Sequence, residues 1–96
     1  MPNDTPEATS QPLMSRVLLL NDDVTPMEFV VYVLESVFDM EREAATQVTL
    51  HIHHHGKGEC GIYPADVAYA RAKLVQDLAC EHQHPLSCVI EPVPSN

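Results

Sequence analysis

Apolar residues are arranged in two ways along the first half of this 96-residue chain. A continuous apolar run at Arg16 to Leu20 predicts a short strand. Residues 26–38 instead carry apolar side chains at the three- and four-residue spacing of one helix face, and residues 41–55 predict a second helix that ends at Gly56. The expected core positions of the first helix are Phe29, Val30, Val33, Leu34, Val37 and Phe38.

The second half of the chain predicts a strand, a helix and a strand. Cys60 to Tyr63 forms the first of these strands, and the chain enters it through a turn at Gly56-Lys57-Gly58. Pro64 begins a helix that ends near Glu81, and Ser87 to Ile90 forms the last strand. We expect the core positions of this third helix to be Val67, Ala70, Leu74 and Leu78.

The resulting order β-α-α-β-α-β predicts an α+β fold of two layers. A three-stranded antiparallel sheet with three helices on one face buries the apolar surfaces of both layers. Residues 1–14 hold prolines and small polar side chains with almost no apolar pattern, so we expect a disordered tail. Residues 15–96 are then a single domain, since a chain of this length supports one modest core.

Composition excludes several classes of function. The net charge is −9 and Lys and Arg together number 5, so we expect no binding to nucleic acid or to anionic membrane surfaces. No apolar run approaches the roughly 20 residues of a spanning helix, and we see no secretory signal. Cys60, Cys80 and Cys88 are an odd set without CxxC spacing, which indicates free thiols and a cytoplasmic location.

The segment LLLNDDVTPMEFV, from Leu18 to Val30, is the most informative part of the chain. Thr25 is placed as a helix N-cap, with Pro26 at the first helical position and Glu28 three residues after the cap. This spacing is typical of a capping box in which proline occupies a position where its missing N–H costs nothing. We therefore expect a helix that begins at Pro26.

Polar residues gather just before that helix. Asn21, Asp22 and Asp23 follow the predicted strand, and Met27 lies in the exposed first turn, where a large apolar side chain has no local structural purpose. A polar rim beside an apolar wall is the outline of a small binding site. Taken alone, however, Asn and Asp before a helix are more often only turn formers.

The histidines do not predict a metal site. His51 and His55 are four residues apart, a spacing that can hold zinc on one helix face, but a third ligand is missing. Histidines at a helix C-terminus are also favourable against the helix dipole. No oxyanion loop, nucleophile elbow or paired-carboxylate pattern accompanies the Cys and His residues. We expect no metal, no cofactor and no enzymatic activity.

Four strings in this chain resemble the ClpS family, the adaptors that deliver N-degron substrates to the ClpA unfoldase of the ClpP protease system. The strings are NDDVTPMEFV, ATQ followed six residues after Gln47 by His53, GKGECGIY and HPLSCVIE. They occur in the family's order from about Arg16 to Pro92. The first string is long and specific, whereas the short pieces would be weak alone. The resemblance implies the same α+β architecture.

The resemblance also implies a substrate site. Asn21, Asp22 and His53 would hold the α-amino group of a substrate, whose first side chain would enter a pocket. The residues implied for that pocket are Asp23, Thr25, Met27, Val30, Thr49, Ile52 and Leu86. Thr49 departs from the family, which more usually carries methionine at this position.

The partners implied are a ClpA-type AAA+ unfoldase and proteins that begin with Leu, Phe, Tyr or Trp. Asp66 and Arg71 match the family's unfoldase-facing positions on the third helix. We expect the adaptor to be a monomer. The alternative is an interaction module that docks on a ring ATPase or a ribosomal partner and does not recognise the first residue of a protein.

Overall fold

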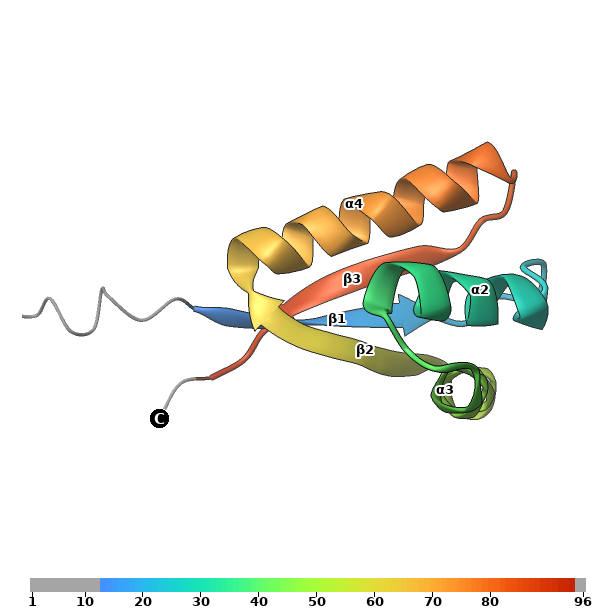
Figure 1. Ribbon diagram of the computed structural model, residues 1–96, viewed down its shortest axis with the longest axis horizontal. Helices are drawn as coiled ribbons and strands as arrows, with labels where there is room; N and C mark the ends of the chain where they lie inside the picture. The colour runs from blue at the N-terminus through green and yellow to red at the C-terminus, as the bar shows by residue number, and fades with distance from the viewer. Residues whose placement is uncertain (1–12, 95–96) are drawn as a thin grey trace, which may run out of the picture.

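A central strand organises the computed structural model, which describes residues 13–94. β1 (Met14–Leu20) pairs antiparallel with β2 (Lys57–Pro64) on one side and with β3 (Ser87–Pro92) on the other, giving the order β2-β1-β3. The helices are α2 (Met27–Phe38), α3 (Arg42–His55) and α4 (Ala65–Glu81) (Figure 1). The predicted α+β fold, with its order β-α-α-β-α-β, is confirmed.

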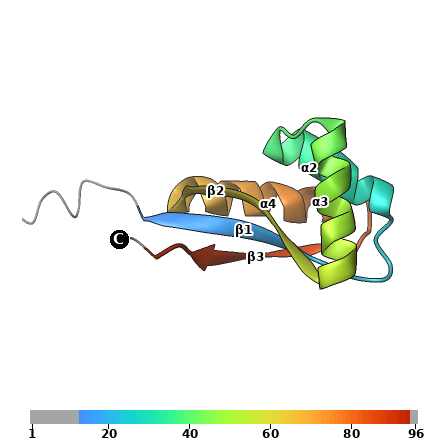
Figure 2. The same cartoon turned by 90° about the horizontal axis from the view of Figure 1, so that it is seen from below.

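The core lies between the sheet and the helices. Val17 and Leu19 are alternate residues of β1, so their side chains point to the same face of the sheet. Both are fully buried, as are Val33 and Leu34 of α2. Figure 2 shows α2 and α4 on the same side of the sheet, with α3 across the end of β2. This arrangement places the end of β1 beside the first turn of α2 and the last turns of α3, which is where the candidate site forms.

All three strands are longer than the sequence predicted, and β3 continues past Ile90 to Pro92. Met14, which we placed in the tail, is the first residue of β1 and pairs with Pro64. The rest of the predicted tail, residues 1–12, lies outside the described residues. Lys57 and Gly58 are not a turn but pair with Leu20 and Leu19. Gly56 makes the reversal from α3 into β2 with a φ of 90°, a backbone conformation that favours glycine.

The predicted core face of α4 was wrong. The buried positions are Ala68, Ala72, Val75 and Ala79, one or two residues after the predicted positions, whereas Leu74 is exposed. Each residue of a helix is turned by about 100° from the previous one, so a shift of one position selects a different face. Alanine allows α4 to lie close to β1 and β3, and the pattern of larger apolar residues therefore pointed to the wrong side.

The predicted capping box at α2 was also wrong. The helix begins at Met27, and Pro26 is the N-cap residue, whose carbonyl accepts the N–H groups of Phe29 (3.0 Å) and Val30 (3.3 Å). No side chain caps this helix. The Thr25 hydroxyl donates instead to Asp22 in the preceding loop, because that carboxylate is a charged acceptor three residues away.

Gly58 permits the close approach of α3 to β2. A Cβ atom at Gly58 would lie 2.6 Å from Cγ1 of Ile52 and 3.4 Å from Cδ2 of His51. Ile52 is buried in the core, so its side chain has little space into which it could move. Glycine at this strand position therefore fixes where α3 presents Ile52 and the residues beside it.

We expect Gly58→Ala to lower the free energy of unfolding by about 1–3 kcal/mol, since overpacking displaces Ile52. Urea denaturation measures the change. Gly61→Ala is the matched control in the same strand, because its added Cβ would meet the tip of the Tyr63 side chain, which is only partly buried and can move aside. Equal stability losses in the two variants would contradict this account.

Candidate functional site

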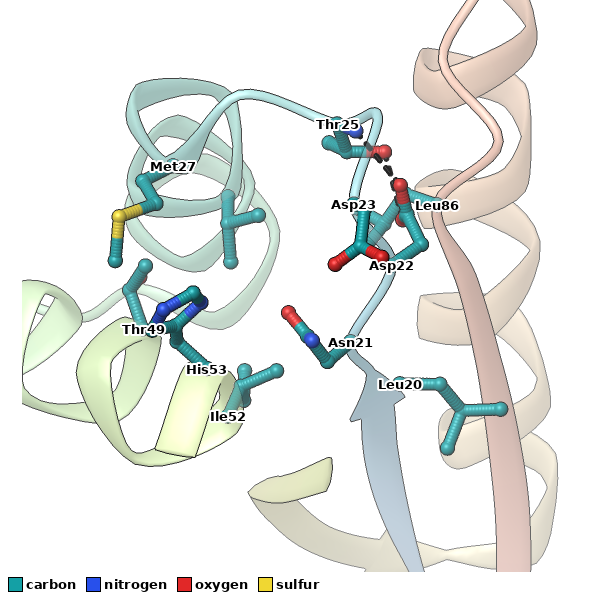
Figure 3. A pocket seen from close by; sticks show the side chains of 11 residues that line it. Leu20, Asn21, Asp22, Asp23, Thr25, Met27, Thr49, Ile52, His53 and Leu86 are labelled. Atoms are coloured by element: carbon teal, nitrogen blue, oxygen red, sulfur yellow. Dashed lines mark hydrogen bonds between the residues drawn. The ribbon is translucent and has the colours of Figure 1, made fainter. Parts of the chain in front are cut away.

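A cavity of about 180 Å³ lies at the carboxyl end of β1, between the loop of residues 21–25, the first turn of α2 and the last turns of α3. Every residue predicted to hold the α-amino group or the first side chain lines it (Figure 3). The lining residues are Leu20, Asn21, Asp22, Asp23, Thr25, Met27, Val30, Thr49, Ile52, His53 and Leu86. The structure thus brings the predicted residues together, and their roles stay a prediction.

The sequence gave no reason to include Leu20 in this site. Its side chain points away from the other lining side chains in Figure 3. The signal that could have identified it is its position, because the last residue of a strand that leads into a polar loop borders whatever that loop encloses.

Asp22 organises the loop that forms one wall. Its Oδ1 atom accepts the backbone N–H groups of Val24 (2.8 Å) and Thr25 (2.6 Å), and its Oδ2 atom accepts the Thr25 hydroxyl (2.8 Å). An Asp side chain that binds backbone groups two and three residues ahead is a common turn former. Thr25 is buried, so these hydrogen bonds keep its polar groups satisfied.

The environment of Asp22 favours its charged form. Burial raises the pKa of the carboxyl group, but the hydrogen bonds from Thr25 and Val24 stabilise the carboxylate and outweigh burial. The electrostatic interaction with His84 acts in the same direction. The net result is a pKa below the ordinary value, so the loop carries a fixed negative charge at neutral pH.

Acceptors at the mouth of the cavity come from both walls. The side chains of Asn21 and Asp23 extend toward the cavity on one side, and the His53 ring lies across from them (Figure 3). All three residues are exposed, whereas Asp22 is turned toward Thr25. Asp23 therefore presents a second carboxylate at the mouth, and the Asp22 carboxylate, which accepts three hydrogen bonds, keeps acceptor capacity.

The remaining walls are apolar and rigid. The buried wall residues are Val30, Thr49, Ile52 and Leu86. The Thr49 hydroxyl donates to the carbonyl oxygen of Ala45 at 2.8 Å, so its proton is used within α3 and leaves no unpaired donor in the wall. Met27 stands at the mouth and is 41% exposed. Such a site can enclose one apolar side chain while its mouth binds a small cation.

The two residues predicted to face an unfoldase lie elsewhere, in the first turns of α4. Asp66 is exposed. Arg71 is held within the fold, because its Nη1 atom donates to the Val37 carbonyl oxygen at 2.6 Å and lies 3.9 Å from Oδ2 of Asp39. Its guanidinium group also lies 5.5 Å from the centroid of the Tyr63 ring. Arg71 therefore joins α4 to the end of α2, whatever else it contacts.

The histidine cluster forms no metal centre of three ligands. The rings of His51 and His55 stack with centroids 4.2 Å apart. Within residues 13–94, no group of three or more His, Cys, Asp or Glu side chains could hold a metal ion. No helix in this same part of the chain is both long enough and apolar enough to cross a membrane.

Comparison with known proteins identifies the family. The family model "ATP-dependent Clp protease adaptor protein ClpS" matches residues 10–89. The ClpS 2 adapter of Rhodopseudomonas palustris is 56% identical over 87 residues, which cover 91% of this chain and 80% of that protein. The ClpS 1 adapter of Agrobacterium fabrum is 55% identical over 83 residues, which cover 86% and 71% of the two chains.

A solved structure agrees with these matches. Agrobacterium tumefaciens ClpS2, bound to L-phenylalaninamide, superposes with a TM-score of 0.84 at 37% identity and covers 86% of this chain and 100% of its own. The fold and the site thus define an adaptor of the Clp protease, not an enzyme. The chain belongs to the ClpS family.

Asp22→Ala should lower the free energy of unfolding by about 1–3 kcal/mol, because three donors lose their acceptor. The folded pKa is lowered, so this stabilisation is present above the unfolded value near 3.8 and is lost as the pH falls through the folded pKa. Urea denaturation at neutral and acid pH measures both effects. Asp23→Ala, which removes none of these hydrogen bonds, is the control; equal losses in both variants would disprove the role of Asp22.

Proposed function

We propose that this protein binds other proteins through a bulky hydrophobic first residue and its free α-amino group, and delivers them to a ClpA-type AAA+ unfoldase for degradation. The observation that supports the proposal most directly is the pairing, in one small cavity, of buried apolar walls with hydrogen-bond acceptors at the mouth. Leu, Phe, Tyr and Trp are the first residues expected to enter it.

The mouth suits an ammonium group. A free α-amino group has a pKa of about 7.7–8.0 and is mostly protonated near neutral pH, so it needs acceptors. Asn21, Asp22 and His53 are the acceptors that we assign to it, and Asp23 adds a second carboxylate close by. Each hydrogen bond to a charged group contributes about 1.5–3 kcal/mol.

The cavity suits one large apolar side chain. Burying a Leu or Phe side chain fully contributes about 1.5–3 kcal/mol. These gains, set against several kcal/mol of lost association entropy, indicate an affinity on the order of micromolar. The ligand of the similar Agrobacterium ClpS2 structure supports this choice, because L-phenylalaninamide offers a free α-amino group and a benzyl side chain.

The alternative is a module that docks on a ring ATPase or a ribosomal partner without reading the first residue of a protein. The two functions differ in which short peptides the protein binds. An N-degron adaptor binds peptides that begin with Leu or Phe and ignores the same peptides begun with Gly, whereas a docking module binds none of them.

Acetylating the N-terminus of a Leu-initiated peptide should weaken binding by well over tenfold, because the charged hydrogen bonds at Asn21, Asp22 and His53 are lost. Fluorescence anisotropy with a labelled peptide measures the change. His53→Ala should weaken binding of the free peptide, whereas His54→Ala, on the same helix turn but outside the cavity, should not. An acetylated peptide that binds as well as the free one would refute N-degron recognition.

Met27→Ala should admit peptides that begin with Ile or Val and leave Leu binding nearly intact. These side chains branch at Cβ, and their extra methyl would meet Met27 at the mouth, a clash of about 1–3 kcal/mol or at least roughly tenfold in affinity. Met14→Ala is the control, since Met14 is similarly exposed (37%) but lies on β1 outside the cavity. If the wild type binds Ile and Leu peptides alike, Met27 is not a gate.

Delivery requires a surface that binds the unfoldase, and we propose that it lies on the first turns of α4. We also propose that the protein acts in the cytoplasm, where its free thiols stay reduced. Asp66 is the exposed residue there, so Asp66→Lys should weaken capture of ClpA without changing peptide affinity. Asp77→Lys, at the other end of the helix, is the control. Undiminished capture by Asp66→Lys would place the unfoldase elsewhere. Arg71 is less suitable for this test, because replacing it would also disturb the fold.

A further inference from the structure

A second hollow lies on the other side of the first turn of α2, and four aromatic rings line it. The groove has a volume of about 530 Å³. The Phe29 ring forms its floor, with centroids 4.6 Å from His84, 5.2 Å from His82 and 6.1 Å from Tyr32. Tyr32 and His82 are themselves 6.3 Å apart. Phe29 belongs to the core, but Tyr32 is 45% exposed and leaves a ring face open to solvent.

This groove and the cavity share their rims. Pro26 lines the groove, whereas its neighbours Thr25 and Met27 line the cavity. His84 lines the groove, and Leu86, two residues later, lines the cavity. A chain whose first residue occupies the cavity therefore lies beside the groove, and each further extended residue adds about 3.3–3.6 Å of reach.

The rings of Tyr32 and Phe29 and the carboxylate of Glu28 are the groups in the groove that attract a cation. The faces of Tyr and Phe rings are negative at their centres and attract Lys or Arg side chains. Glu28 adds a carboxylate at the edge, and the net charge of the protein is −9. Arg42 and the imidazoles of His82 and His84 also line the groove, and the Nε atom of Arg42 is paired with Oε2 of Glu35 at 3.4 Å.

We infer that the groove is a second substrate subsite, which binds a Lys or Arg side chain a few residues after the first residue of the bound protein. The inference rests on the proposed function, because only a chain anchored in the cavity is held beside the groove. Tyr32 is the residue that sets this preference, since its ring is the most accessible and can change without disturbing the core.

A peptide series tests the inference. Each peptide begins with Leu, has an otherwise neutral tail and carries one Lys, whose position moves by one residue from peptide to peptide. Fluorescence anisotropy gives the affinity of each peptide. We expect Lys at a particular position to tighten binding by about two- to fivefold over Gln at the same place, the size expected for a cation over exposed rings. General attraction to an acidic protein would instead help at every position alike.

Three variants separate ring recognition from charge. Tyr32→Ala should abolish the gain in affinity from Lys and leave the affinity of neutral-tail peptides unchanged. Tyr32→Phe should retain the gain, because it keeps the ring. Neither substitution changes the net charge of the protein, so a difference between them reports on the ring. Tyr69→Ala is the control, since Tyr69 is an exposed tyrosine (67%) on α4 outside the groove and should keep the gain. If only the overall charge attracts Lys, added salt should weaken the binding of Lys peptides equally in the wild type and in all variants, and this outcome would contradict the inference.

The outcomes are distinct. If neutral-tail Leu peptides bind but Lys gives no position-dependent gain, or Tyr32→Ala retains that gain, the subsite is disproved and the proposed function stands. If no Leu peptide binds, the proposed function itself fails. If Tyr32→Ala leaves all peptides unchanged but weakens capture of ClpA, the groove serves the unfoldase and the inference is wrong.

Discussion

One backbone hydrogen bond joins the two walls of the site. The N–H of Asn21, the first residue after β1, donates to the carbonyl oxygen of Gly56 at 2.9 Å. Gly56 ends α3 in a left-handed conformation and turns the chain into β2, which then pairs back along β1. The loop of Asn21 to Asp23 and the last turn of α3 are thus held together at the end of the central strand, and His53 faces that loop across the cavity (Figure 3).

The adjacent carboxylates divide the work of the polar wall. Asp22 accepts hydrogen bonds from its own loop and contributes a fixed charge, whereas Asp23 extends toward the cavity. A loop held only by ligand contacts would lose conformational entropy on binding. Because Asp22 holds this loop before any ligand arrives, the acceptors at the mouth are positioned in advance. The rigid walls at Ile52 and Leu86 act in the same sense for the apolar side chain.

The element order could be predicted because strong local signals define it, whereas the position of the site followed from the resemblance to the ClpS family, since the string NDD alone is more typical of a turn. The apolar face of α2 is recognisable even if the predicted bounds of the helix shift by a residue or two, and the string NDD keeps its place before the helix. The face of α4 could not be read, because Ala68 and Ala72 are weakly apolar and only the nearness of the sheet makes them core residues. The capping box failed for a related reason: the Thr25 hydroxyl had two possible partners, and sequence spacing does not rank them.

The lining of the cavity shows which sequence departures matter. Thr49 replaces the larger methionine that the family more usually carries, yet its hydroxyl is bonded to Ala45 and the wall remains apolar. The resemblance implies more room at Thr49 than methionine would leave, without an added unpaired polar group. On the proposed function, selectivity then depends on Thr49 and Met27, which line the cavity from different helices. Gly58, which permits the close approach of α3 to β2, would contribute to it from outside the cavity.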